Sequence, residues 1–250
     1  SPEESPGGSP EDAPPPSPDS PLPEDEGLYG WGSNENNALG LASGVSGTST
    51  ATRLPVGDFS AVEAGNTFAC GLSAVGQSVY CWGNNSFGQV GSGSTTPSAV
   101  RIPVLVSGAS TVAAFAAGYE FACYGPVLVS DPGSRVHCWG RNNVGQLGDG
   151  TLVDSAAPVA NTLAASGANV MIDMSGGYDH MCGVSVNRQL YCWGGNAYGQ
   201  VGATPSANRP NYNLVPAPAS YNYGGGPYYR VASGRYYTCA VVLDGGVSCF

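Results

Sequence analysis

The sequence has little charge and no lysine. Apart from two histidines, its basic side chains are eight arginines, and charged residues make up 10% of the 250 residues, well below the usual quarter. No run of 18 apolar residues occurs, so no membrane-spanning helix is expected. The net charge of −10 and the lack of a basic patch argue against a nucleic-acid-binding surface.

The acidic charge is concentrated at the N-terminus. Residues 1–27 carry eight acidic residues, no basic residue and nine of the twenty prolines, whereas the ten acidic residues from Leu28 onward nearly balance the eight arginines. Such a segment has too little apolar surface for a core, and its prolines favour disorder or polyproline II. The sequence therefore predicts an acidic Ser-Pro-rich arm over 1–27 and a nearly neutral body over 28–250.

Repeated Ser-Pro pairs and the run Pro14-Pro15-Pro16 dominate the arm. In these features the arm resembles the hydroxyproline-rich glycoproteins of plant and green-algal surfaces. The resemblance implies a glycosylated stalk, since Pro- and Ser-rich tracts of this kind can be O-glycosylated, and a plain disordered linker is the alternative. The candidate glycosylated residues are Ser5, Pro6, Ser9, Pro10, Pro14, Pro15, Pro16, Ser17, Pro18, Ser20 and Pro21.

The body is built from repeats. Trp-Gly pairs occur at Trp31, Trp82, Trp139 and Trp193, and Phe250 takes the tryptophan position of a fifth copy, so that aligned positions lie 51, 57, 54 and 57 residues apart. A Gly-x-x-x-x-Cys phrase precedes the pair, and a phrase of the type Gly-Gln-Val-Gly follows it. The repeat phrases cover residues 28–40, 62–91, 115–148, 174–202 and 231–250.

The repeat phrases indicate an all-β fold. Short β-branched and aromatic runs between Gly, Asn and Ser clusters predict strands and tight turns. A mostly-strand repeat of roughly 50 residues predicts a β-propeller or a β-solenoid.

The order Cys-Gly-Leu…Val-Tyr-Cys-Trp-Gly-Asn-Asn-x-x-Gly-Gln-Val-Gly, from Cys70 to Gly91, closely resembles the regulator of chromosome condensation repeat, and the resemblance extends over 28–250. The resemblance implies a β-propeller, most often of seven blades, although four periods are present here. The cysteine-bearing subtype is similar to repeats of secreted proteins and of plant receptor-kinase ectodomains.

The eight cysteines fall twice in each repeat, on the two arms of a predicted hairpin. The repeat selects the pairs Cys70–Cys81, Cys123–Cys138, Cys182–Cys192 and Cys239–Cys249. Zinc is the competing interpretation, but no Cys-x-x-Cys spacing occurs. Four disulfides imply an oxidising compartment, so we expect a secreted protein. No secretory leader is visible, and we expect the sequence to begin after a cleaved leader or to be a fragment.

The sequence predicts no enzyme, cofactor or metal site. His180 follows Asp179, which superficially suggests an oriented base. However, the aligned positions hold Phe68, Phe121 and Tyr237, so the position is one of packing. His137 aligns with strand residues such as Tyr80, and no nucleophile elbow or phosphate-binding loop occurs.

Two places depart from the repeat. Asn84-Asn85-Ser86 is an N-glycosylation sequon in a predicted surface turn, which makes Asn84 a candidate glycosylation site. The segment 203–233 is a long, tyrosine-rich loop, and tyrosines suit binding surfaces because they offer large, rigid contact areas. Packing of these aromatics over the body is the alternative. The interaction candidates are Tyr212, Tyr221, Tyr223, Tyr228 and Tyr229.

We therefore predict a non-enzymatic extracellular structural glycoprotein, a subunit of a matrix, surface appendage or fibril of algal or plant type. It is expected to assemble through propeller and arm contacts, with other copies or other extracellular proteins as partners. The alternative is a secreted or receptor-ectodomain module that binds a protein or glycan through the loop 203–233. The sequence leaves open whether four blades close a ring, whether the ends of different molecules join, or whether more blades follow.

Overall fold

The computed structural model describes residues 27–42, 44–75, 77–127, 135–162, 170–214 and 227–250, with the backbone alone for residues 206–214. Apart from a short 3-10 turn, η2 (Glu35–Asn37), every regular element in these residues is a β-strand. The all-β prediction is therefore confirmed. The predicted arm lies outside the described residues except for Gly27.

Three antiparallel four-stranded sheets form complete blades. The first blade holds β3 (Phe59–Ala64), β4 (Phe68–Ser73), β5 (Val79–Asn84) and β6 (Ala99–Leu105). The second blade holds β7 (Val112–Ala117), β8 (Phe121–Pro126), β9 (His137–Gly140) and β10 (Ser155–Ala160). The third blade holds β11 (Met171–Gly176), β12 (His180–Ser185), β13 (Leu190–Asn196) and β14 (Ser206–Leu214).

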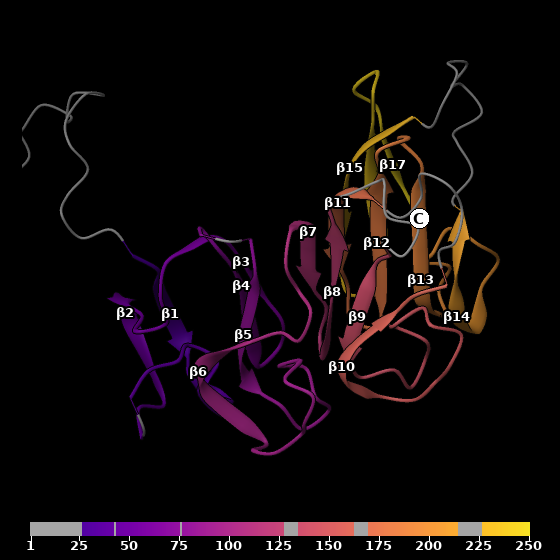
Figure 1. The fold of residues 1–250 in the computed structure, drawn as a ribbon. Helices are drawn as coiled ribbons and strands as arrows, with labels where there is room; N and C mark the ends of the chain where they lie inside the picture. Colours follow the sequence, from indigo (N-terminus) through magenta and orange to yellow (C-terminus); the bar gives the residue numbers. More distant parts are fainter. Residues whose placement is uncertain (1–26, 43, 76, 128–134, 163–169, 215–226) are drawn as a thin grey trace, which may run out of the picture.

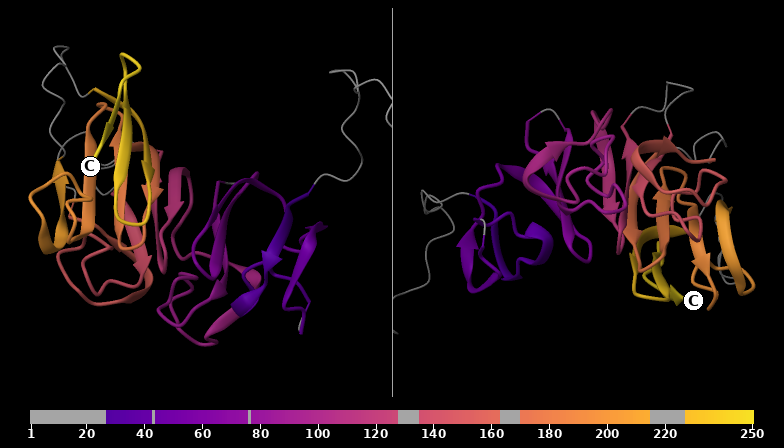
Figure 2. Two further views of the ribbon diagram at one scale, coloured as in Figure 1. Left: turned by 180° about the vertical axis from the view of Figure 1, so that it is seen from behind. Right: turned by 90° about the horizontal axis from the view of Figure 1, so that it is seen from below.

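Smaller sheets stand at the two ends of the arc that these blades form (Figures 1 and 2). The N-terminal sheet pairs β1 (Tyr29–Ser33) with β2 (Gly47–Arg53). The C-terminal sheet holds β15 (Tyr228–Ser233), β16 (Thr238–Val242) and β17 (Val247–Cys249). The described residues thus form an open arc and not a closed ring. The sequence predicts a long loop over 203–233, but this segment contains the strands β14 and β15.

Each cysteine pair joins the second and third strands of its sheet. The two cysteines of a pair are direct register partners, as Cys70 and Cys81 are on β4 and β5. Their Cα atoms are 4.0–4.2 Å apart, and the four bonds are those that the sequence predicts, Cys70–Cys81, Cys123–Cys138, Cys182–Cys192 and Cys239–Cys249. Each bridge closes a loop of 10–15 residues, a constraint worth about 3 kcal/mol in the chain-entropy model.

The apolar core lies between neighbouring sheets. Phe68 and Val79 of the first blade pack with Val112 and Trp139 of the second, and equivalent clusters fill the next two interfaces. A fourth cluster joins the N-terminal sheet to the first blade around Trp82. Each repeat therefore completes its core only against its neighbour, as in other repeat proteins.

A tryptophan hydrogen bond joins consecutive repeats. The indole Nε1 of Trp82 donates to the carbonyl oxygen of Ala38 at 2.9 Å, and Trp139 and Trp193 donate to those of Gln89 and Gln146, both at 2.8 Å. These three indoles are 0–1% exposed. The bond explains why the Trp-Gly pair and the Gly-Gln phrase recur together.

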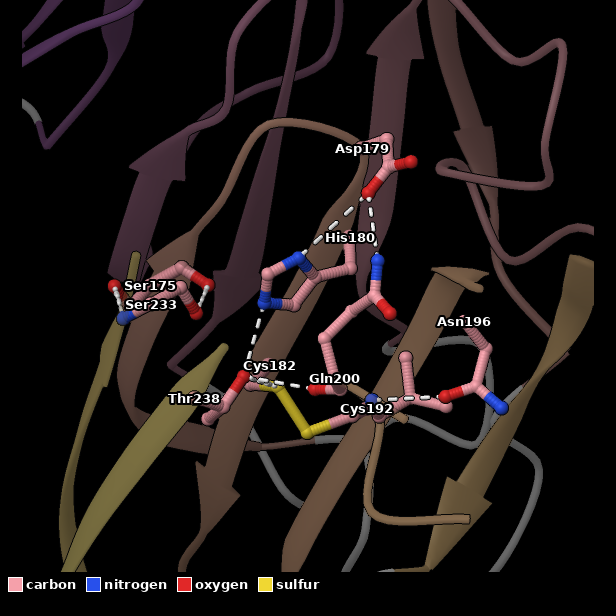
Figure 3. The surroundings of a disulfide bond; sticks show 10 residues. Ser175, Asp179, His180, Cys182, Cys192, Asn196, Gln200, Ser233 and Thr238 are labelled. Carbon is pink, nitrogen blue, oxygen red and sulfur yellow. Dashed lines mark hydrogen bonds and ion pairs between the residues drawn. A yellow bond between two sulfur atoms is a disulfide. The ribbon is translucent and has the colours of Figure 1, made fainter. Parts of the chain in front are cut away.

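Phe250 has no donor for this bond, and Thr238 replaces it (Figure 3). Its Oγ1 donates to the carbonyl oxygen of Gln200 at 2.9 Å and lies 2.9 Å from Nε2 of His180. The interface between the third blade and the C-terminal sheet therefore keeps the contact with a different side chain.

Two glycines of the second repeat illustrate why this residue recurs. Gly140, which follows Trp139, has φ +102°, a conformation that side chains rarely adopt. Gly118 has no such φ, but a Cβ there would collide with the ring of Phe121. The glycine and the aromatic residue three positions later are thus one packing unit.

Replacing Trp139 by Phe should remove the buried bond to Gln89 and leave that carbonyl group without a donor. We expect a loss of about 1–3 kcal/mol in the free energy of unfolding, measured by urea denaturation of the oxidised protein. Thr238→Val should have a similar effect at the last interface. Trp31→Phe, measured at a dilution at which the protein is monomeric, is the matched control, because Trp31 is 66% exposed within one chain, and an equal loss in this control would contradict the assignment.

Candidate binding site

The innermost strands of four sheets end side by side at the inner edge of the arc. A backbone hydrogen bond joins each of the four turns that follow them to the next. Asn66 N donates to Tyr119 O at 3.0 Å, Tyr119 N to Gly177 O at 3.1 Å, and Tyr178 N to Arg235 O at 3.3 Å. These turns are the starts of the Gly-x-x-x-x-Cys phrases, so the repeat itself positions one side chain from each phrase at this edge.

A groove of about 560 Å³ runs along the four turns. We call it the inner-edge groove, and its lining residues are Ala64, Gly65, Asn66, Ala117, Gly118, Tyr119, Gly176, Gly177, Tyr178, Ser233, Gly234 and Arg235. Backbone and small residues form most of the floor. The largest side chains that line it are those of Tyr119, Tyr178 and Arg235.

Aromatic rings continue from the groove as an unbroken band. The ring centroids of Tyr119 and Tyr178 are 4.3 Å apart, those of Tyr178 and Tyr236 are 5.5 Å apart, and those of Tyr236 and Tyr198 are 5.1 Å apart. The Arg235 guanidinium carbon lies 4.9 Å from the Tyr178 centroid and 5.1 Å from that of Tyr236, which are cation–π distances. We call these five residues the Tyr–Arg band.

Neighbouring carboxylates have partners of their own. Arg141 Nη1 pairs with Glu120 Oε2 at 2.5 Å, and Gln200 Nε2 donates to Asp179 Oδ1 at 3.2 Å. Arg235 is exposed, and no carboxylate within the described part of the chain forms an ion pair with it. The band thus presents one cation beside exposed and half-buried aromatic rings.

Both histidines pack against neighbouring side chains. His180 is fully buried between the third blade and the C-terminal sheet, bonded to Thr238, so its position is one of packing, as the sequence predicts. His137 stacks on Tyr124 at 5.2 Å, and burial lowers its pKa. Within the described residues, no group of three or more His, Cys, Asp and Glu side chains could hold a metal ion.

The interaction candidates from the sequence meet different outcomes. Tyr228 is wrong as an interaction candidate, because it is 1% exposed and belongs to the core between the third blade and the C-terminal sheet. Tyr229 is 45% exposed, with Arg188 and Arg230 each 5.3 Å from its ring centroid. Tyr221, Tyr223 and the side chain of Tyr212 lie outside the described residues.

The predicted glycosylation site Asn84 lies at the end of β5, and its Oδ1 accepts a hydrogen bond from Ser86 N at 2.8 Å. Its neighbour Asn85 is fully buried and organises the turn, because its Oδ1 accepts a bond from Val90 N. The half-buried Asn84 is thus the asparagine of this pair that reaches solvent. The candidates in the arm lie outside the described residues.

The Tyr–Arg band is not among the residues predicted from the sequence. The signal is present in the sequence: the residue after the glycine of each Gly-x-x-x-x-Cys phrase varies among Asn66, Tyr119, Tyr178 and Arg235, while the glycine and the cysteine of the phrase are shared. A variable position inside a fixed frame is typical of a binding surface.

The two ends of the arc expose side chains whose repeat equivalents are buried. Trp31 is 66% exposed, against 0–1% for the other tryptophans. Tyr237 is 57% exposed, although the aligned Phe68, Phe121 and His180 are 0–1% exposed. Val247 is 67% exposed, whereas its counterparts Val79, Val136 and Leu190 are fully buried. Both ends of the arc therefore expose apolar side chains at positions that the internal repeats bury.

The fold is that of a disulfide-bonded repeat protein of the β-propeller class. A family model described as the regulator of chromosome condensation (RCC1) repeat matches residues 78–124, 134–184 and 189–241, and a second model of that repeat matches 59–89 and 171–200. The chain belongs to the RCC1 repeat family.

Relatives and similar structures agree with this membership. The chain is 28% identical over 220 residues to the ultraviolet-B receptor UVR8 of Arabidopsis thaliana, covering 87% of this chain and 47% of the relative. It is 27% identical to the probable E3 ubiquitin-protein ligase HERC4 of Mus musculus, over 67% of this chain and 15% of that protein.

Among solved structures, human WBSCR16 superimposes with a TM-score of 0.73 at 19% identity, covering 89% of this chain and 55% of that one. Prp20p from Saccharomyces cerevisiae has a TM-score of 0.67 at 19% identity, with coverages of 89% and 53%. The chain thus spans about half the length of UVR8 and of these structures. No helix in the described residues is long and apolar enough to cross a membrane.

Glu63, on β3 beside the groove, gives a test of the electrostatics. Desolvation raises the pKa of its carboxyl group and the Asp173 charge adds to this, while a hydrogen bond from the Ala117 backbone lowers it. A carboxyl group with a raised pKa in the folded state favours folding when protonated, and the folded protein loses that stability as pH rises through the raised value.

Glu63→Gln keeps an acceptor for Ala117 and removes the charge. We therefore expect a higher melting temperature than for the unaltered protein at pH 7, with the difference vanishing below the pKa of an unfolded glutamate, about 4.3. Thermal unfolding followed by circular dichroism from pH 3 to pH 8 measures it. Glu35→Gln at an exposed site is the control, and a pH-independent difference for Glu63→Gln would refute the explanation.

Proposed function

We propose that the chain is a non-enzymatic extracellular structural protein that assembles with further copies through the two ends of its arc. The exposure of Trp31 carries this proposal. The three other tryptophans are buried against the preceding repeat and donate to its backbone. Trp31 is 66% exposed, so its indole ring and its N–H donor can contact a surface like the one that a preceding repeat offers the other tryptophans.

The opposite end supplies a complementary surface. Tyr237 and Val247 are exposed where internal repeats bury the aligned residues against the following repeat. The N-terminal end thus exposes the surface that internal repeats pack on a preceding repeat, and the C-terminal end exposes the surface that they pack on a following repeat. A contact between the N-terminal end of one copy and the C-terminal end of another satisfies both, and this contact is heterologous, of the kind that makes rings or filaments.

The disulfides support an extracellular location. Every cysteine in the chain is bonded, and four bridges that hold hairpins together persist only in an oxidising environment. The half-buried sequon asparagine Asn84 and the Ser-Pro pairs of the arm fit a glycoprotein of a surface or matrix. The charge-poor, glycine-rich body suits a structural role more than catalysis.

A binding function is the second candidate, and the Tyr–Arg band favours it. Solved structures of the family include yeast RCC1 (Prp20) bound by Kap60, and a structure of Prp20p is described together with its binding properties to Gsp1p and histones. A surface of exposed tyrosines and one arginine on this propeller could likewise contact a protein partner. The predicted binding loop 203–233 is then replaced by the inner edge of the arc.

The assembly proposal predicts oligomers of the full chain at micromolar concentration, observed by light scattering after size exclusion and by electron microscopy. Val247→Asp places a charge on the C-terminal end and should raise the concentration at half-assembly at least tenfold. Trp31→Ser should do the same from the other end. If the unaltered chain is still monomeric at about 100 μM, a concentration 10–100 times above the micromolar range expected for assembly, the proposal is refuted.

The matched control is Ile102→Asp. Ile102 is 62% exposed and apolar like Val247, but it lies on β6 of an internal blade. Its charge variant should assemble as the unaltered chain does. A comparable loss of assembly in this control would show that general surface hydrophobicity, and not the ends, drives association.

The glycoprotein part has a separate test. We expect the protein from its native source to be heavier than its sequence mass of 25.3 kDa, with modified peptides from residues 1–27 and a glycan on Asn84. Intact mass before and after deglycosylation, followed by peptide mapping, measures both. An unmodified mass removes the glycoprotein claim and leaves the assembly proposal in place.

A further inference from the structure

We propose that the inner-edge groove and the Tyr–Arg band bind the chain's own acidic proline-rich arm, residues 1–26. This is an additional site, separate from the ends of the arc. The occupant is an extended proline-rich segment, recognised by tyrosine rings through its prolines and by Arg235 through its carboxylates.

The geometry of the band fits a proline-rich chain. Proline-rich segments dock into aromatic-lined grooves because their polyproline II conformation costs little entropy to fix and their pyrrolidine rings pack on flat aromatic faces. Four tyrosine rings follow one another at centroid spacings of 4.3–5.5 Å beside the groove. The floor of backbone and small residues lets an extended chain approach closely.

Charge selects the kind of proline-rich chain. Arg235 is exposed, while Glu120 and Asp179 nearby are occupied by Arg141 and Gln200. A carboxylate beside a proline can accept hydrogen bonds from the Arg235 guanidinium while that group keeps its contacts to the rings of Tyr178 and Tyr236. A charge-assisted bond of guanidinium to carboxylate is stronger than a neutral one.

The arm repeats that chemistry at a regular interval. Ser1-Pro2-Glu3, Ser9-Pro10-Glu11 and Ser17-Pro18-Asp19 recur every eight residues, each with an acidic residue directly after a proline. The arm has eight acidic residues, nine prolines and no basic residue. Three equivalent segments raise the probability that one of them occupies the groove, without any increase in the affinity of each.

The arm is long enough to reach the site. Twenty-six residues in polyproline II extend about 80 Å at 3.1 Å per residue, whereas a compact domain of the size of the body has a radius of gyration of about 17 Å. A tethered segment has an effective concentration near the millimolar range. Even a weak site with a dissociation constant of about 0.1 mM would then be about 90% occupied within one molecule.

Cleavage by a glutamate-specific protease tests this in the full chain with an unmodified arm. We expect cleavage after Glu11 and Glu24, followed by mass spectrometry, to be about tenfold slower than in a free synthetic peptide of residues 1–26. Arg235→Gln and Tyr198→Ala should restore the rate of the free peptide. Both positions are exposed, so folding should survive, which circular dichroism checks.

The matched controls are Arg230→Gln and Tyr229→Ala, an exposed arginine–tyrosine pair outside the groove. They should leave the arm protected. Cleavage of the unaltered chain at the rate of the free peptide overturns the proposal, as does protection that persists in Arg235→Gln and Tyr198→Ala. Protection that disappears on dilution from 50 μM to about 0.5 μM assigns the arm to a second copy and overturns docking within one molecule. Val247→Asp separates this site from the assembly proposal, because it should weaken assembly and leave protection unchanged.

Discussion

The structure depends on one hydrogen bond repeated between neighbours, from a buried tryptophan to a backbone carbonyl of the preceding repeat. The bond runs from Trp82 to Ala38, from Trp139 to Gln89 and from Trp193 to Gln146. It joins two sequence phrases roughly 50 residues apart, and the apolar core between the sheets forms around it. Because the donor belongs to one repeat and the acceptor to the previous one, no repeat is complete alone.

This dependence on neighbours explains why both ends of the arc are unusual surfaces. Within the chain, Thr238 shows that the bond can be kept by another donor when tryptophan is lost. At Trp31 no described neighbour supplies the acceptor side, and the ring lies in solvent. The proposed self-assembly would therefore use between molecules the same contact that stabilises each interface between repeats within a molecule.

At the inner edge of the arc, the residues that hold the turns differ from the residues that line the groove. Gly118 and Phe121 hold their turn by close packing, so neither can vary without moving the backbone. The residue directly after each glycine lines the groove and carries no such constraint, so Asn66, Tyr119, Tyr178 and Arg235 can differ there. The side chains of the inner edge can thus differ while the propeller remains intact, as is common for surfaces placed on a rigid scaffold.

The sequence by itself determined the repeat, the all-β class and the four cysteine pairs, because each is a local pattern multiplied four times. It also indicated that His180 occupies a packing position, since aligned residues share one environment. Tertiary structure alone decided which tyrosines matter. Tyr228 became core and Tyr119, Tyr178, Tyr198 and Tyr236 met across three sheets, because their proximity depends on how blades pack and not on distance along the chain. The open arc and the exposure of Trp31 were decided in the same way, since burial is a property of neighbours that the residue type does not record.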